Sequence, residues 1–231
     1  MGYQDKNLKY INAGAYDKRG ENSILEKYVL SLWQPFLKKI IGNLSVGKIV
    51  IDLGCGTGEY TQAATNAKKI YAVDVSSEML KICREKLIDF NQAEIILSDI
   101  QNFKMVEPAD LIITIGIWEY ISPPDLLDTI KKITRRGSKV IVVFPNIYNE
   151  LNLARSLGRM KKIALRPGFI KKLFKKDFLI IDGASLGMVS WMPKKLQSLI
   201  LPLWKFCDWL WEPFQKFFPL GVNVYYLFER I

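Results

Sequence analysis

The sequence predicts an α/β fold of the doubly wound type, in which helices cover both faces of a largely parallel sheet. Apolar, β-branched runs alternate with segments of helical apolar spacing between residues 48 and 145. A glycine-rich bend, IDLGCGTGEY at 51–60, follows the first of these runs. The 231 residues are 49% hydrophobic, which is enough to bury the core of one domain with a modest appendage.

The chain opens with a predicted helical segment and continues with predicted strands. Residues 21–41 carry apolar side chains at helical spacing, and Pro35 is expected to bend this helix. In the run KIVIDLG at 48–54, residues 49–51 between Lys48 and Asp52 are all apolar and β-branched, as in a strand buried on both faces. In chain order, strands are expected at 48–54, 69–75, 93–100, 109–117, 138–145, 177–186 and 222–231.

Helices are expected between these strands. A short helix is predicted at 60–67, and a longer one at 78–90 with Ser77 as its N-cap. Ser122 is the predicted N-cap of a helix that runs to about Thr134, because prolines occupy the first helical positions. Strand and helix repeating in this way imply right-handed crossovers and parallel strands.

Cysteine and histidine usage limits the chemistry. The three cysteines, Cys55, Cys83 and Cys207, lie far apart and show neither a disulfide framework nor metal-ligand spacing. The chain has no histidine, which removes the usual general base and the usual metal ligand. We therefore expect no metal, a reducing compartment and a cytoplasmic location. The polar start, MGYQDKNLKY, has no apolar signal core, so we expect no secretion signal.

The glycine-rich bend is a candidate ligand site. In a doubly wound sheet, ligands bind at the carboxyl ends of the strands, where the strand order reverses. Gly54, Gly56 and Gly58 would bring backbone N–H groups against a ligand, and the expected helix at 60–67 would point its positive end at the same place. Asp74 ends the second strand, where a carboxylate can accept ribose hydroxyls.

Two ligand classes remain open at this bend. A dinucleotide site favours G-x-G-x-x-G, whereas this chain has G-x-G-x-G with Glu59 in place of the last glycine. Glu59 would bring negative charge close to a pyrophosphate, so a ligand that ends in one amino-acid carboxylate suits the bend better. Asp74 serves either class, and Asp99, at the end of the third strand, adds a carboxylate to the same rim.

The segments VIDLGCGTGEY, YAVDVSSEML, ILSDI and DLIITIGIWEYI resemble, in order and spacing, the successive motifs of class I S-adenosylmethionine-dependent methyltransferases. The resemblance extends over about residues 47–145 and is nearest to the small-molecule group that includes the ubiquinone-biosynthesis enzymes. It implies a Rossmann-like, seven-stranded sheet whose last strand is antiparallel, a position that 222–231 fits. It also implies S-adenosylmethionine as cofactor and S-adenosylhomocysteine as product.

The resemblance further implies a set of cofactor-binding residues. They fall into four groups: Asp52, Gly54, Cys55, Gly56 and Gly58 around the methionine end, Asp74 and Val75 at the ribose, Asp99 and Ile100 at the adenine, and Gly116 and Ile117 at the methyl-donor end.

Candidate catalytic residues follow the fourth strand and precede the first helix. Many relatives have Glu-His where this chain has Glu119-Tyr120, so a histidine-dependent proton removal is not available here. The stretch GAYDKRG at 14–20 resembles an N-terminal lid and contributes Tyr16. Glu119, Tyr120 and Tyr16 are the candidates for proton transfer, and the alternative for each is packing or a solvated rim position. Cys55 lies in the bend, but a catalytic thiol is disfavoured there.

The last third of the chain is basic and aromatic. Residues 151–231 hold 14 Lys and Arg against 5 Asp and Glu, and the stretch 155–176 contains nine basic residues and no acidic one. The segment 191–221 is rich in Trp, Phe and Leu, and its prolines at 202, 213 and 219 are expected to break it up. Its apolar runs are too short to span a bilayer, which needs about 20 residues.

Three interpretations of this region remain open. The insertion at 191–221 could cover a hydrophobic acceptor pocket and dock on an anionic membrane. It could instead be a substrate-capping subdomain or a dimer interface. RNA binding is disfavoured, because no known RNA-binding module is present and the aromatic residues cluster with aliphatic ones.

The sequence as a whole predicts one methyltransferase domain over residues 1–231. It comprises a helical lid at 1–44, a cofactor-binding core at 45–150 and an acceptor-side region at 151–231 with the aromatic insertion and the final strands. The expected reaction is methyl transfer to a small or lipid-like acceptor at oxygen, with contact to an anionic membrane as an option. The alternatives are an RNA methyltransferase, an NAD(P)-dependent oxidoreductase and a non-catalytic cofactor-binding partner.

Overall fold

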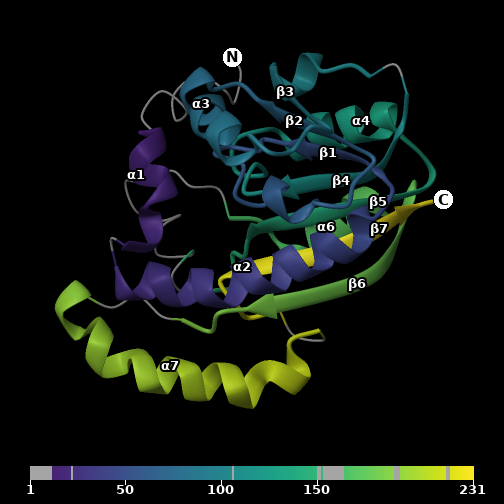
Figure 1. Ribbon diagram of the computed structural model, residues 1–231. Coiled ribbons are helices and arrows are strands. Elements are labelled where there is room, and N and C mark those ends of the chain that lie inside the picture. Colours follow the sequence, from purple (N-terminus) through teal and green to yellow (C-terminus); the bar gives the residue numbers. More distant parts are fainter. Residues whose placement is uncertain are drawn as a thin grey trace.

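The computed structural model describes residues 12–21, 23–105, 107–149, 152, 164–189, 193–216 and 219–231. Within these residues, seven strands form one sheet with the order β3-β2-β1-β4-β5-β7-β6 (Figure 1). The strands are β1 (Ile49–Leu53), β2 (Lys69–Asp74), β3 (Ala93–Leu97), β4 (Ala109–Ile115), β5 (Thr134–Pro145), β6 (Phe178–Leu186) and β7 (Asn223–Arg230). β7 is antiparallel to both of its neighbours, and the other pairings are parallel. The predicted fold class is confirmed.

Helices cover both faces of this sheet. The described helices are α1 (Ala13–Asp17), α2 (Ile24–Ser45), α3 (Ser77–Lys86), α4 (Pro123–Ile133), α6 (Pro167–Phe174) and α7 (Gln197–Trp211). α2 packs on one face through Trp33, Leu37 and Ile41. α4 and α6 pack on the opposite face, where α6 contributes Ile170 and Phe174.

β1 shows why the strands are apolar without interruption. All five of its residues are buried. Ile49, Ile51 and Leu53 belong to the core under α4 and α6, whereas Val50 belongs to the core under α2. Because successive side chains point to opposite faces, a central strand covered on both sides needs apolar residues at nearly every position.

The helix expected at 60–67 is absent. This segment forms only a three-residue 3₁₀ turn, Thr61–Ala63, and the N–H of Lys68 already donates to the carbonyl of Lys48 at 2.9 Å. The Thr61 hydroxyl is engaged by Asp52, and Thr and Asn at 65 and 66 are poor helix formers. The expectation of a helix positive end at the glycine bend is therefore wrong.

Helix boundaries differ from the prediction in two further places. Ser76, not Ser77, is the N-cap of α3, and its hydroxyl accepts from the N–H of Met79 at 3.3 Å. Pro202 lies inside α7 and does not end it. The ring is exposed on the outer side of that helix, so it costs a hydrogen bond to the Ser198 carbonyl without a buried clash. Ser122 is the N-cap of α4 as expected, although its side chain makes no capping hydrogen bond.

The aromatic insertion before the last strand is helical, as expected. Figure 1 shows α7 outside the sheet, alongside α2. Trp204 is buried there and stacks on Tyr28 of α2 with ring centroids 6.5 Å apart. Four residues of the basic stretch, 155, 159, 161 and 162, lie outside the described residues, as do 190–192 and 217–218.

Candidate functional site

Three glycines shape the bend after β1. Gly54, Gly56 and Gly58 all have positive φ, the region that other residues rarely adopt. A Cβ on Gly54 would lie 2.1 Å from Ile117, so this position also needs the missing side chain for space. A Cβ on Gly56 would meet only the Tyr16 ring, at 3.8 Å, so the backbone of Gly56 faces open space beneath that ring. The bend thus presents bare backbone to a ligand.

Asp74 holds this bend to the second strand. Its Oδ2 accepts from the N–H of Gly56 at 2.9 Å, and its Oδ1 accepts from the N–H of Ser76 at 2.9 Å. Burial raises the pKa of Asp74 above its usual value, although both N–H groups act in the opposite direction. Each carboxylate oxygen can accept a second hydrogen bond, which is the capacity that a pair of ribose hydroxyls requires.

Asp52 is buried under the bend. Its Oδ2 accepts from the Thr61 hydroxyl at 2.6 Å. Burial raises the pKa of Asp52 to about 7, and the nearby charge of Asp74 adds to the rise. Asp52 lines a small hollow of about 20 Å³ together with Gly54 and Cys55. The hydrogen bond to Thr61 makes Asp52 a support of the bend.

Cys55 points into the core. A hydrogen bond with Cys83 and burial raise the pKa of the Cys55 thiol well above its usual value. The thiolate is the reactive form of cysteine, so this group is held in its unreactive form.

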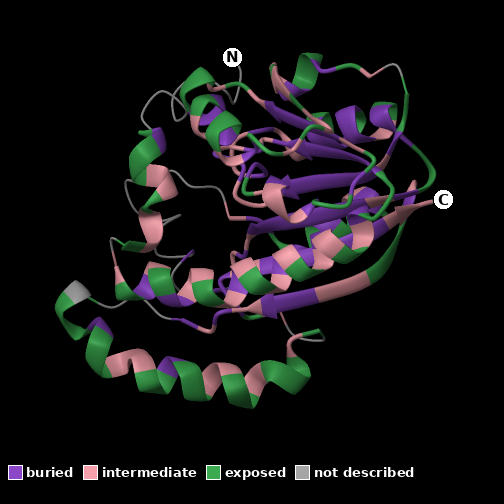
Figure 2. Ribbon diagram, viewed as in Figure 1, coloured by how far each residue is buried: buried purple, intermediate pink, exposed green. Residues whose placement is uncertain are grey.

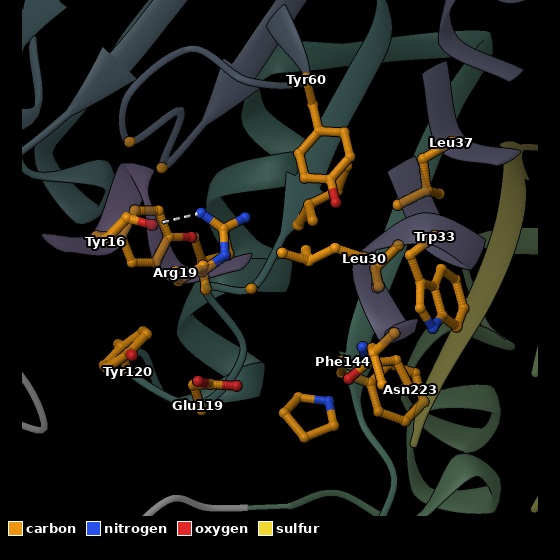
Figure 3. A pocket seen from close by; sticks show the side chains of 18 of the residues that line it. Tyr16, Arg19, Leu30, Trp33, Leu37, Tyr60, Glu119, Tyr120, Phe144 and Asn223 are labelled. Atoms are coloured by element: carbon orange, nitrogen blue, oxygen red, sulfur yellow. Dashed lines mark hydrogen bonds between the residues drawn. The ribbon is translucent and has the colours of Figure 1, made fainter. Parts of the chain in front are cut away.

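A cavity of about 290 Å³ opens beside the bend, at the carboxyl ends of β1, β2, β4 and β5 (Figure 3). β7 runs the other way, so its first residue, Asn223, pairs with Pro145 and joins the same edge. The volume is close to the lower limit of about 300 Å³ for small-molecule pockets. The lining residues that concern us are Tyr16, Arg19, Val29, Leu30, Trp33, Leu37, Gly54, Gly56, Asp74, Gly116, Ile117, Glu119, Tyr120, Phe144 and Asn223.

Arg19 supplies positive charge to the cavity. Among the described lining residues it is the only cation. Its Nη1 donates to the Tyr16 carbonyl at 2.9 Å, and its guanidinium lies 4.2 Å from the centroid of the Tyr16 ring. Within the part of the chain that the structure describes, Arg19 has no carboxylate partner. An anionic group of a ligand can therefore pair with it.

Glu59 points away from this cavity. Its carboxylate pairs with Lys38 at 2.6 Å and with Lys86 at 3.2 Å. Partial burial raises the pKa of Glu59, but both lysines outweigh burial and bring the pKa below its usual value. Because this charge is compensated, the expected repulsion between Glu59 and a pyrophosphate loses its force as an argument against a dinucleotide.

The three candidate catalytic residues lie on one side of the cavity. Figure 3 shows Tyr120 and Glu119 below Tyr16, across from the α2 residues. Burial raises the pKa of Tyr16, and the charges of Glu119 and Asp74 add to this, while Arg19 opposes it. Burial and the Glu119 carboxylate also raise the pKa of Tyr120. Both phenols therefore stay protonated at neutral pH and can donate hydrogen bonds, but they cannot remove a proton.

The remaining expected cofactor residues are placed differently. Gly116 and Ile117 line the cavity, whereas Asp99, Ile100 and Val75 are not part of its lining. Asp99 is the N-cap of a 3₁₀ turn, where its Oδ1 accepts from the N–H of Gln101 at 3.0 Å. Ile100 is buried close behind the bend, and Val75 is 49% exposed. The adenine-binding role of Asp99 and Ile100 stays a prediction.

Sequence reasoning missed the wall opposite the bend. α2 contributes Leu30, Trp33 and Leu37, and β7 contributes Asn223. Trp33 is buried, and its indole N–H has no hydrogen-bond partner among the described residues. The helical apolar pattern of α2 indicates burial but not which cavity it faces. Arg19 could have been found, because it belongs to the GAYDKRG stretch. No group of three or more potential metal ligands occurs among the described residues.

The cavity fits S-adenosylmethionine in its chemistry. Gly56 gives open backbone, Asp74 has free acceptor capacity for ribose hydroxyls, and Arg19 can meet an amino-acid carboxylate. Asp74 is bonded to the N–H of Gly56, and the Tyr16 ring lies over Gly56 and against Arg19, so one elongated ligand could contact all three.

Comparison with known proteins agrees with this geometry. Residues 50–137 match the family model described as a methyltransferase domain. The chain is 26% identical over 127 residues to a demethylmenaquinone methyltransferase of Staphylococcus saprophyticus, an alignment that covers 53% of each chain. It is 26% identical over 151 residues to a ribosomal RNA small subunit methyltransferase A of Staphylococcus carnosus, covering 56% of this chain and 51% of the relative. The chain thus spans about half the length of these relatives.

A solved structure extends the likeness to the whole fold. The magnesium protoporphyrin IX methyltransferase of Synechocystis PCC 6803, crystallised with bound S-adenosylhomocysteine, superposes with a TM-score of 0.67. The match covers 96% of this chain and 97% of that one at 14% sequence identity, so it speaks for the fold. The matching domain model over residues 50–137, the glycine bend and this shared fold support S-adenosylmethionine as the cofactor of a methyltransferase domain.

Proposed function

We propose that this protein transfers a methyl group from S-adenosylmethionine to a small or lipid-like acceptor, at an oxygen atom and at the cytoplasmic surface of a membrane. The observation that carries the proposal is the cavity of about 290 Å³ beside the bend. One side of it has Gly56, Asp74 and Arg19, and the opposite side is an apolar wall from α2. Cofactor and acceptor would thus meet in one space.

The cofactor side is assigned by chemistry. Asp74 would accept hydrogen bonds from the ribose, the backbone at Gly56 would lie along the methionine portion, and Arg19 would pair with its carboxylate. When bound, the cofactor supplies a methyl group on a positively charged sulfur that needs no further activation. The protein then mainly aligns the acceptor and excludes water, and alignment alone can contribute roughly 7–11 kcal/mol.

The acceptor side favours an apolar molecule with a hydroxyl group. Leu30, Trp33 and Leu37 of α2 and Phe144 of β5 offer apolar surface for the body of such a molecule. A hydroxyl must lose its proton when it is methylated. Since both tyrosines stay protonated, Glu119 is the candidate base, and Tyr16 and Tyr120 would orient the acceptor oxygen as donors.

Two measurements test the proposal. Calorimetry should show binding of S-adenosylhomocysteine but not of NAD or NADP. Incubation with methyl-labelled cofactor and a fractionated cell extract should then label the organic-soluble fraction. An Asp74→Ala variant is the negative control, because it removes the acceptor for the ribose hydroxyls and the hydrogen bond that holds Gly56.

Each outcome separates the alternatives. Label in the RNA fraction would replace the proposed acceptor by RNA, which the similarity to the ribosomal RNA enzyme makes the second candidate. Cofactor binding with no labelled fraction would indicate a non-catalytic binding partner. NAD binding in place of S-adenosylhomocysteine would end the proposal. Retained labelling in Glu119→Gln would exclude Glu119 as the base.

A further inference from the structure

α7 (Gln197–Trp211) is apolar on its outer side as well as its inner side. The inner side packs against α2 through Trp204, with Ile200 and Leu201 partly buried beside it. The outer side exposes a continuous set of large apolar side chains: Leu199, Leu203, Phe206, Trp209 and Leu210. Figure 2 shows this outer side as exposed, in contrast to the buried sheet. A helix that is apolar all round is normally covered on all sides, so this face implies a partner.

The helix is fixed on the protein, so its outer face is held in one orientation. Asp208 turns inward, where its Oδ2 accepts from the Tyr28 hydroxyl at 2.5 Å and its Oδ1 from the N–H of Met188 at 2.7 Å. Gln197 accepts from the N–H of Leu25 at 3.2 Å. These bonds tie both ends of α7 to the start of α2 and to the turn after β6. Because these hydrogen bonds fix α7, its large exposed side chains form a surface of fixed shape and orientation that a partner can bind.

Charge at the edges of this face is mainly positive. Lys195 and Lys205 are exposed beside it, whereas Lys216, which follows, is paired with Asp182 at 3.0 Å. Of the two acids nearby, Asp208 is engaged inward, and Glu212 is exposed beyond the C-terminal end of the helix. Residues 151–231 as a whole carry a net charge of +9. An apolar stripe with tryptophan and flanking lysines is the pattern of a helix that lies in the interface of an anionic bilayer.

The size of the face argues against a second copy of the chain. A helix of 15 residues is about 22 Å long and about 10 Å wide, so one face offers roughly 200–300 Å². A stable protein interface buries about 800 Å² on each partner. A bilayer interface needs only that the apolar side chains enter the headgroup boundary, to a depth of about 5–10 Å. Within the described part of the chain, no helix has the length and apolarity to cross a bilayer.

We infer that the outer face of α7 docks this protein on an anionic lipid surface. The inference rests on the proposed function, because docking would serve the uptake of a lipid-like acceptor. α2 contacts α7 on one side and contributes the apolar wall of the cavity on another. Val29 shows this arrangement, because it both lines the cavity and packs against the α7 cluster. A docked α7 therefore places the acceptor side of the cavity one helix away from the lipid from which a lipid-like acceptor would come.

The test is co-sedimentation of the full chain with vesicles. The vesicles contain phosphatidylcholine alone or phosphatidylcholine mixed with anionic phosphatidylglycerol. We expect binding to the anionic vesicles that weakens as salt rises. Leu199→Ser, Leu203→Ser and Phe206→Ser combined should weaken this binding by about tenfold or more, because they remove much of the apolar surface. Lys195→Glu with Lys205→Glu should weaken it selectively at low salt.

A matched control carries three apolar-to-serine substitutions outside α7. Ile88→Ser, Leu97→Ser and Leu179→Ser remove three exposed apolar side chains from other elements and should leave vesicle binding unchanged. Calorimetric binding of S-adenosylhomocysteine should be the same in all these variants, which shows that they are folded.

Three results would overturn the inference. They are no binding of the unaltered chain to anionic vesicles, equal binding by the α7 variant, and a dimer in sedimentation equilibrium that the α7 variant converts to a monomer. Binding of S-adenosylhomocysteine without vesicle binding would reject the docking surface and leave the methyltransferase proposal standing. Vesicle binding without binding of S-adenosylhomocysteine would reject the methyltransferase proposal and leave the docking surface standing.

Discussion

Charged side chains around the glycine bend fall into two groups that serve different ends. Glu59 is neutralised by two lysines, and Asp52 is buried against the Thr61 hydroxyl, so both act on the protein itself. Arg19 and Asp74 line the cavity and keep capacity for a ligand. A cofactor with a carboxylate at one end and ribose hydroxyls in the middle can pair its carboxylate with Arg19 and donate its hydroxyl hydrogen bonds to Asp74.

The pairing of Arg19 with the cofactor carboxylate can be separated from its packing on Tyr16. Replacing Arg19 by Met should weaken binding of S-adenosylhomocysteine by roughly 10- to 100-fold, since a hydrogen bond to a charged group contributes about 1.5–3 kcal/mol. Binding of 5′-methylthioadenosine, which lacks the carboxylate, should not change. Isothermal titration calorimetry measures both. Equal losses for the two ligands would mean that Arg19 only holds the Tyr16 ring in place, and Arg19→Lys should restore part of the affinity.

Asp52 should make stability depend on pH in the opposite sense to a carboxylate whose pKa is lowered on folding, such as Asp17. Burial raises its pKa from 3.8 to about 7. Between these values the folded protein holds a proton that the unfolded chain releases, so the free energy of unfolding falls as pH rises and levels off above about pH 7. Each pKa unit corresponds to about 1.4 kcal/mol, so Asp52→Asn should gain up to a few kcal/mol over the unaltered protein above pH 7.

Urea unfolding across this pH range measures the effect of Asp52. Asn at this position can still accept from the Thr61 hydroxyl, so the bend should persist. Asp89→Asn, at an exposed position, should leave the pH profile unchanged. An identical slope in Asp52→Asn and the unaltered protein would show that Asp52 is ionised throughout.

Among the elements, strands could be predicted closely and short helices could not. β1 and β2 could be predicted because a strand covered on both faces is apolar at nearly every position, and Asp52 is the one polar residue of IVIDL. In the segment 60–67 the alanines favour a helix and Thr65 and Asn66 do not, and the Asp52–Thr61 hydrogen bond and the return to the sheet hold it in a single 3₁₀ turn. These contacts join the segment to β1 and to the sheet, and a pattern of helical propensity within 60–67 does not reveal them. α7 was foreseen as helical, but not that it would continue through Pro202.

α1 (Ala13–Asp17) is held to the site by the Tyr16 ring over Gly56 and by polar contacts of Asp17. Asp17 accepts from the Thr57 hydroxyl at 2.7 Å and pairs with Lys86 of α3. Partial burial raises the pKa of Asp17, but hydrogen bonds from Lys86 and Thr57 outweigh burial and leave the pKa below its usual value. The contact is thus present above the ordinary pKa of an aspartate and is lost as pH falls through the folded value.

Removing this contact should loosen α1 without unfolding the domain. In Asp17→Ala, amide exchange of residues 13–17 should become roughly two- to fivefold faster, the range expected for a solvent-screened ion pair. Hydrogen-exchange mass spectrometry measures it, and the exchange of β1 should stay the same. Glu94→Ala, which removes the exposed Lys69–Glu94 pair on β3, is the control. Faster exchange of residues 13–17 in both variants would mean that the effect does not come from the Asp17 contact.

At the scale of the molecule, the cavity is lined by residues that lie close together in the sequence and by others that lie far away from them. The sequence could predict the first group but not the second. The bend, Asp74, Gly116 and Ile117 lie in one contiguous region, and their spacing pointed to the cofactor. Trp33 and Asn223 reach the same cavity from opposite ends of the chain. Asn223 does so because β7 is antiparallel, which brings its first residue to the carboxyl edge of β5. The acceptor wall is therefore a property of topology.

The return from the α7 insertion to β7 depends on Asn146, at the end of β5. Its side chain is fully buried, and Nδ2 donates to the carbonyls of Pro219 at 2.7 Å and Gly221 at 3.0 Å. Oδ1 accepts from the N–H of Tyr148 at 3.1 Å. Together with Asn149, which donates to the carbonyl of Leu220 at 3.1 Å, and Ser185, which accepts from the N–H of Gly221 at 2.8 Å, Asn146 thus fixes the segment that leads into the cavity wall at Asn223.

Asn146→Ala should therefore destabilise the whole domain. It leaves buried backbone groups without partners, at about 1–3 kcal/mol for each such group. For a chain of this length each kcal/mol lowers the melting temperature by about 2–4 °C, so calorimetry should show a fall of roughly 5–10 °C. Asn91→Ala, at an exposed turn, should melt with the unaltered protein. If Asn146→Ala melts there too, the last third of the chain is held by α7 and the sheet alone. If only the Asn146 variant falls, saturating S-adenosylhomocysteine should raise both proteins by similar amounts, because the bend and Asp74 are untouched.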